Sequence, residues 1–79
     1  MKRIIKGRMY NTETAIDCGA WFDDTMSHLC CLMRKKNGEY FINDDTGRIS
    51  PISVDEAKQF AEDFLTVDEY IKEFGPVEE

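Results

Sequence analysis

The residues of this chain that could act as nucleophiles or metal ligands lie near its middle. His28, Cys30 and Cys31 fall close together, and Cys18 lies upstream. A cysteine beside a histidine can become a thiol nucleophile, and the two types together can bind zinc. Zinc motifs separate paired ligands by two to four residues, however, and no feature of the sequence indicates a lowered thiol pKa. We therefore expect no catalytic residue, no metal site and no cofactor, and the cysteines are interpreted as free, small hydrophobic residues.

Two short motifs further along resemble catalytic or ion-binding loops. Asp45-Thr46-Gly47 is the tripeptide of aspartic proteases, and residues 43–47 loosely match a calcium loop. The glutamate that would close the calcium loop is missing from the sequence. A short run of Asp, Thr and Gly after a strand is typical of a tight turn, which is the structure we expect here.

The strongest pattern in the sequence is the charge of its C-terminal third. The chain has 16 acidic and 10 basic residues, a net charge of −6. Residues 53–79 hold nine carboxylates and two lysines, a net charge of −7, so the rest of the chain nets +1. A concentrated negative field selects basic partners and disfavours direct binding to nucleic acid. The four N-terminal bases are interpreted as solvating an edge strand. They are Lys2, Arg3, Lys6 and Arg8.

Length and hydropathy predict a single domain that spans residues 1–79. No apolar run approaches the roughly 18 residues that a membrane span requires. The basic N-terminus lacks the apolar stretch of a secretion signal. We expect a protein of the cytoplasm with no membrane contact, and the odd number of cysteines, three, agrees with that compartment.

The sequence of the N-terminal half predicts short strands and helices joined by turns. Ile4 and Ile5 favour a strand over residues 2–10, and Asn11 or Thr12 can cap a short helix that runs to about residue 18. Residues 20–27 are expected to form a loop.

Asn37-Gly38 lies between two apolar runs and predicts a hairpin with a two-residue type I′ turn. Its strands would cover residues 29–36 and 39–43, with Met33 opposite Ile42. One face would then be the core face, and the other would be mixed. The expected core face carries Leu29, Cys31, Met33, Tyr40 and Ile42. The mixed face carries His28, Cys30, Leu32, Arg34, Phe41 and Asn43.

Two amphipathic helices are predicted after the sheet, over about 54–65 and 67–74. Each begins with a capping box, Ser53-x-x-Glu56 and Thr66-x-x-Glu69, and each has apolar residues at helical spacing. The expected buried residues are Val54, Ala57, Phe60, Ala61, Phe64, Leu65, Val67, Tyr70, Ile71 and Phe74. The predicted fold class is therefore α+β: a small antiparallel sheet of about three strands, with a short N-terminal helix and two C-terminal helices packed on it.

The carboxylates of these helices fall off the apolar stripes and are expected to be solvated. Asp55 and Glu62 are seven residues apart, which places them on one face about 10 Å apart. Acids in first turns are explained by the helix dipole alone, whereas those later in the helices are not. The two interpretations are a solubilising surface and a surface that imitates the charge of DNA. The candidate contacts are Asp55, Glu56, Glu62, Asp63, Asp68, Glu69 and Glu73, with Asp23 and Asp24 as secondary candidates.

Three stretches of the chain resemble a group of small proteins of bacterial phages and mobile elements. They are residues 10–15 after a basic strand, residues 37–41 in a hairpin, and residues 49–53 leading into Glu56-Ala57. Small acidic proteins of this kind are similar to anti-CRISPR proteins that act on type I surveillance complexes, several of which imitate DNA. The resemblance implies an inhibitor in the cytoplasm of a bacterial host that blocks the basic DNA-binding site of such a complex.

The family that this chain resembles supplies no catalytic residues, so we expect a protein without enzymatic activity. We also expect it to be a monomer. The alternative is a regulatory, antitoxin-like interaction module. It would bind its partner through the mixed hairpin face with Leu32 and Phe41.

Overall fold

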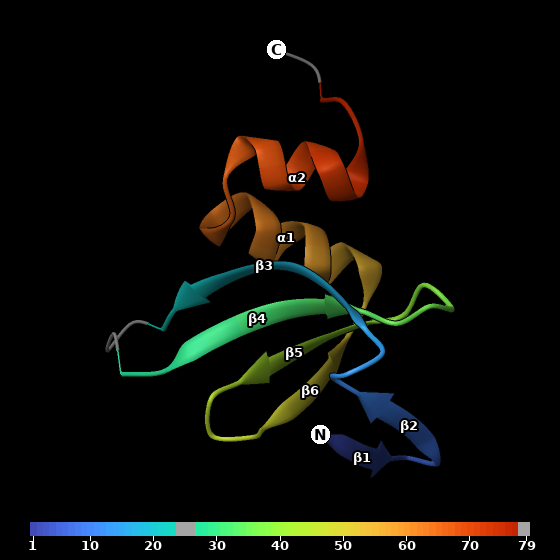
Figure 1. The fold of residues 1–79 in the computed structure, drawn as a ribbon. Helices are drawn as coiled ribbons and strands as arrows, with labels where there is room; N and C mark the ends of the chain where they lie inside the picture. The colour runs from blue at the N-terminus through green and yellow to red at the C-terminus, as the bar shows by residue number, and fades with distance from the viewer. Residues whose placement is uncertain (24–26, 78–79) are drawn as a thin grey trace.

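A computed structural model describes residues 1–23 and 27–77. In that part of the chain, six strands precede two helices (Figure 1). They are β1 (Lys2–Ile5), β2 (Arg8–Asn11), β3 (Ile16–Phe22), β4 (Leu29–Arg34), β5 (Tyr40–Asp44), β6 (Ile49–Ile52), α1 (Val54–Phe64) and α2 (Val67–Phe74). Strands β3 to β6 form an antiparallel sheet in sequence order, and β1 and β2 form a separate hairpin. The helices lie on one side of the larger sheet, and the β1–β2 hairpin lies on the other.

The fold is α+β, but the predicted three-stranded sheet and N-terminal helix are wrong. The segment expected to be a helix forms a turn, in which the Ala15 amide donates to the Asn11 carbonyl at 3.1 Å, and then enters β3. Residues 20–22, expected in a loop, belong to the same strand. The helical pattern covered only one or two turns, and pairing of Ile16–Phe22 with β4 overrides so weak a local preference.

The strand predicted over residues 2–10 is instead a tight hairpin. Lys6 and Gly7 both have positive φ, 51° and 76°, and they connect the paired residues Ile5 and Arg8. Positive φ at both central residues is the mark of the type I′ turn. The turn was missed because lysine rarely takes this conformation, so only Gly7 signals it in the sequence.

The β4–β5 hairpin is confirmed, but its predicted register is wrong by one residue. Met33 pairs with Phe41, and Leu32 pairs with Ile42. The loop has three residues, Lys36 to Gly38: the Gly38 amide donates to the Lys35 carbonyl at 2.9 Å, and Gly38 alone in the loop has positive φ, 92°. After two-residue loops, three-residue loops with glycine in the last position are among the most common hairpin connections.

This register exchanges the faces of β5 and buries both sides of the sheet. Leu32 lies under the helices with Tyr40, and Phe41 lies under the β1–β2 hairpin with Tyr10. Leu32 and Phe41, assigned to a mixed face, are both 0% exposed. A partner contact through these two side chains is therefore not possible in this fold.

Both C-terminal helices and both capping boxes are confirmed. The Ser53 hydroxyl accepts from the Glu56 amide at 3.1 Å, and the Glu56 carboxylate accepts from the Ser53 amide at the same distance. Thr66 and Glu69 repeat this arrangement on α2. Burial along the apolar stripes is only partly as predicted, because several large side chains stay exposed. These are Val54 at 49%, Phe64 at 42%, Val67 at 70% and Ile71 at 39%.

Gly19 marks the place where the helices approach the sheet most closely. Strand β3 bulges between Asp17 and Gly19, and Gly19 has φ +149°. A Cβ at this position would lie 2.5 Å from Leu65 Cδ2 and 3.1 Å from the Glu69 carboxylate. The bulge and the missing side chain together make room for the segment that joins α1 to α2.

We predict that Gly19→Ala lowers the free energy of unfolding by about 3 kcal/mol, because it combines backbone strain with a steric clash. Gly38→Ala is the matched control, since its φ is also positive but nothing lies within 4 Å of the added carbon. The control should cost only about 1 kcal/mol. Urea denaturation of both variants measures the difference, and equal costs would show that the contact with Leu65 adds nothing.

Candidate functional site

The acidic surface consists of five exposed carboxylates on α1 and on the first turn of α2: Asp55, Glu56, Glu62, Asp63 and Asp68. On α1 they form two rows that face away from the buried Ala57 and Ala61. Among residues 1–23 and 27–77, no lysine or arginine forms an ion pair with any of the five. None of these five charges is therefore held in a direct ion pair within the described chain, and the one base on α1, Lys58, leaves the helix with a net negative charge.

The dipole of α1 does not explain the two carboxylates at its end. Glu62 and Asp63 lie in the last turn, where the helix end already carries partial negative charge. That turn contains no basic residue. Asp63 has a local partner, because the Gln59 side-chain amide donates to it at 3.2 Å. Glu56 also has a structural role, as half of the α1 capping box.

Glu73 does not belong to this surface. Its side chain is only 9% exposed, and its Oε2 atom lies 2.7 Å from Arg34 Nε on β4. The same oxygen accepts a hydrogen bond of 2.5 Å from the Tyr40 hydroxyl on β5. Glu73 thus anchors α2 to the sheet, and its charge is compensated inside the protein. Glu69, which is half-buried and caps α2, contributes less to the surface than predicted.

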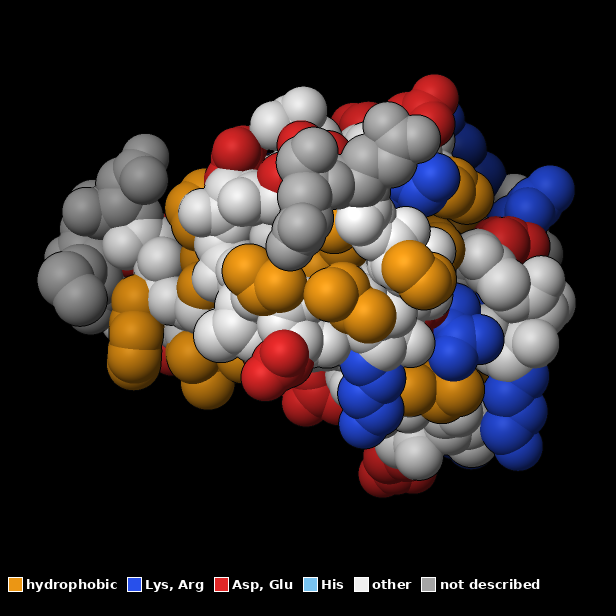
Figure 2. All heavy atoms as spheres, turned by 90° about the horizontal axis from the view of Figure 1, so that it is seen from above, with side chains coloured by type: hydrophobic (Ala, Val, Ile, Leu, Met, Phe, Trp, Pro, Cys, Tyr) orange, Lys and Arg blue, Asp and Glu red, His pale blue; other side chains and the backbone are white. Residues whose placement is uncertain are grey.

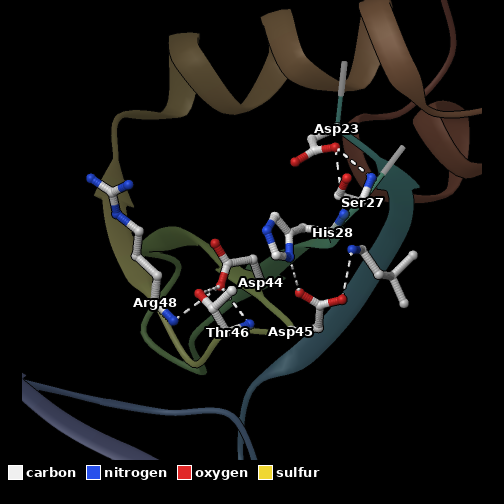
Figure 3. A network of polar contacts seen from close by, with 8 residues as sticks. Asp23, Ser27, His28, Asp44, Asp45, Thr46 and Arg48 are labelled. Carbon is white, nitrogen blue, oxygen red and sulfur yellow. Dashed lines mark hydrogen bonds and ion pairs between the residues drawn. The ribbon is translucent and has the colours of Figure 1, made fainter. Parts of the chain in front are cut away.

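Asp23 and Asp24 are the secondary candidates, and Asp23 directly follows β3. Asp24 falls outside the described residues. Asp23 Oδ1 accepts from the backbone amides of Ser27 and His28 at 3.1 and 3.4 Å (Figure 3). The Asp23 carboxylate therefore joins the end of β3 to the residues that precede β4.

The Asp44–Gly47 segment is the turn that the sequence predicted. Asp44 Oδ1 accepts from the amides of Thr46 and Arg48 at 3.0 and 3.1 Å, as Figure 3 shows. The Thr46 hydroxyl hydrogen bond is the main reason that the pKa of Asp44 is lowered. Asp45 contacts His28 Nδ1 at 2.9 Å and accepts from the Leu29 amide. These contacts use the carboxylates to join the residues before β4 to the turn between β5 and β6, at one end of the larger sheet.

The three cysteines are free and half-buried. Burial, followed by the neighbouring Glu73 carboxylate, raises the pKa of Cys18 to about 12. Burial and nearby aspartates raise the pKa of Cys30 and Cys31 as well. His28 faces Asp45, and within the described residues no three His, Cys, Asp or Glu side chains gather in a way that could hold a metal ion. The thiols are thus poorly ionised at neutral pH.

The sequence interpretation missed a groove between the two helices. Its volume is about 480 Å³. Residues of both helices and of the segment after α2 line it: Ala61, Glu62, Leu65, Thr66, Val67, Tyr70, Ile71 and Val77. Figure 2 shows hydrophobic side chains gathered over α2, with both acidic and basic side chains around them. The sequence carried no signal of this groove. At 100° per residue the apolar side chains of α2 span an arc of only about 100°, which is typical of a helix that buries them on one surface.

None of the helices in the described part of the chain is long and apolar enough to cross a membrane. Comparison of the chain with protein-family models, with curated proteins and with solved structures found no match.

We predict that Glu73→Ala lowers the free energy of unfolding by about 2 kcal/mol, since it leaves Arg34 and the Tyr40 hydroxyl without their partner. Glu62→Ala, on the exposed side of α1, should change it by less than about 0.5 kcal/mol. Thermal and urea denaturation measure both values. Similar costs for the two variants would mean that the buried contacts of Glu73 do not hold α2 in place.

We predict slow alkylation of all three thiols in the native protein, because raised pKa values leave little thiolate at neutral pH. At pH 7.5, iodoacetamide should label the native protein at least about ten times more slowly than the urea-unfolded chain. Mass spectrometry of time points assigns each label. A cysteine that reacts as fast in the native protein as in the unfolded chain would contradict this prediction and would favour a catalytic role for its thiol.

Proposed function

We propose that this protein binds the basic, nucleic-acid-binding surface of another protein through its acidic surface and so excludes nucleic acid from that site. The observation that carries this proposal is the set of five exposed carboxylates with no intramolecular lysine or arginine partner in the described residues. A surface built only for solubility gains nothing from Glu62 and Asp63 at the negative end of a helix.

The physical basis of the proposed inhibition is imitation of a phosphate array. Duplex DNA presents about one negative charge per 1.7 Å of its axis, and a protein groove that binds it offers lysine and arginine side chains. Carboxylates seven residues apart on a helix are about 10 Å apart, and the capping boxes fix the helices that carry them. Because the helices that carry these charges are already folded, binding requires little ordering of the backbone.

The resemblance to small acidic phage proteins narrows the proposed target. On that basis, the partner is the DNA-binding surface of a type I CRISPR surveillance complex in the cytoplasm of a bacterial host. The chain would act as a monomer and as a steric and electrostatic competitor of target DNA, without a catalytic step.

We predict that Glu62→Lys/Asp63→Lys weakens inhibition about 10- to 100-fold, because attraction to the basic site becomes repulsion. Fluorescence anisotropy of labelled target DNA, with a purified type I surveillance complex and increasing amounts of inhibitor, measures the effect. The fold should survive, since lysines in the last turn of α1 complement the helix dipole. Circular dichroism and thermal denaturation check this point.

Glu13→Lys is the matched control for a single reversal, Glu62→Lys, because both change the net charge equally. The Glu13 side chain is 73% exposed and lies in the turn before β3, away from the helices. The control should inhibit like the wild type, or nearly so. If the two single reversals weaken inhibition equally, net charge and not the acidic surface governs binding. Full inhibition by the double variant would exclude the acidic surface as the binding site.

A further inference from the structure

The groove between α1 and α2 is an apolar site within the acidic surface. Its floor includes Ala61, which is 1% exposed, and its edges carry Val67 and Val77, which are 70% and 53% exposed. Val67 and Val77 belong to neither of the two core clusters. A contiguous apolar groove on a small domain commonly marks a binding surface.

The charges around the groove indicate what kind of partner fits it. Among the described residues, Glu62 is the charged side chain that lines it. Asp68 and Lys72 lie next to lining residues in the sequence, but neither lines the groove itself. Within the described part of the chain, no lysine or arginine lines the groove. An occupant must therefore be apolar where it touches the floor and basic where it meets the rim.

We propose that the groove receives the apolar side chains of a basic amphipathic helix. Open grooves between packed helices commonly bind a helix, whose residues at i, i+3, i+4 and i+7 enter the groove. Lysines and arginines beside those residues would meet Glu62, which lines the groove. The proposal rests on the proposed function, because it identifies a helix of the same basic partner as the segment that the two helices hold.

The groove gives the interaction a component that salt does not screen. Ion pairs on an exposed surface weaken as ionic strength rises, whereas apolar burial does not. A partner held by charge alone would dissociate steeply with salt. A partner that also fills the groove keeps part of its affinity, and that part depends on Val67 and Ile71.

The test uses a labelled synthetic peptide of about 18 residues, built from lysine and leucine with leucines at helical spacing. A second peptide of the same composition has its leucines scattered. Fluorescence anisotropy at low and moderate salt compares wild type with Val67→Ser/Ile71→Ser, which changes no charge. We expect the double variant to bind the amphipathic peptide about tenfold more weakly at both salt concentrations. The scattered peptide should bind weakly and should not distinguish the two proteins.

Ile4→Ser/Met9→Ser is the matched control, since it removes two exposed apolar side chains, 74% and 54% exposed, from the β1–β2 hairpin. It should bind the amphipathic peptide like the wild type. Equal binding by the groove variant and the wild type would overturn the groove proposal. Equal binding of the two peptides by the wild type would do the same, because attraction would then be electrostatic only.

Two further outcomes separate this proposal from the one it rests on. If Glu62→Lys/Asp63→Lys still blocks target DNA while Val67→Ser/Ile71→Ser does not, the proposed acidic contact fails, and with it the contact of the helix with Glu62, while the apolar contact in the groove stands. Sedimentation velocity over a range of protein concentrations tests the remaining occupant, a second copy of this chain. A dimer that Val67→Ser/Ile71→Ser abolishes would overturn the proposal of a basic helix.

Discussion

The register between β4 and β5 is the constraint on which the rest of the molecule depends. It pairs Arg34 with Tyr40, so that both side chains meet Glu73 of α2 from the same face of the sheet. The same register sends Met33 and Phe41 to the other face, under the β1–β2 hairpin. A shift of one residue would turn one strand over and separate Arg34 from Tyr40. The three-residue loop that ends at Gly38 therefore determines which residues of β4 and β5 enter each of the two core clusters and where α2 is anchored.

The acidic surface depends on this anchoring, because α2 is too short to be stable alone. It has eight residues, and isolated helices below about 12 residues are marginal in water. Its capping box orders the first turn, and Glu73 ties the last turn to the sheet. Helix α1 is held by Ala57 and Ala61 against the sheet, so its outward carboxylates also have fixed positions. Charge placement in this protein is thus a consequence of packing.

The sequence predicted what local chemistry decides. The capping boxes at Ser53 and Thr66, the turn at Asp44–Gly47 and the location of the β4–β5 hairpin each depend on neighbouring residues, and each is confirmed. Features that depend on distant partners could not be predicted. The burial of Glu73 requires Arg34, and β3 is a strand because β4 lies beside it. Asn37-Gly38 suits two loop lengths, so its preferred residues could not fix the register.

The exposed groove follows from the way α2 is anchored. Residues two apart on a helix differ by about 200° in direction, so burying Glu73 against Arg34 turns Ile71 away from the sheet. Val67, one turn before Ile71, points outward on the same side. The ion pair that holds α2 and the groove beside the carboxylates are therefore two results of one orientation of the helix.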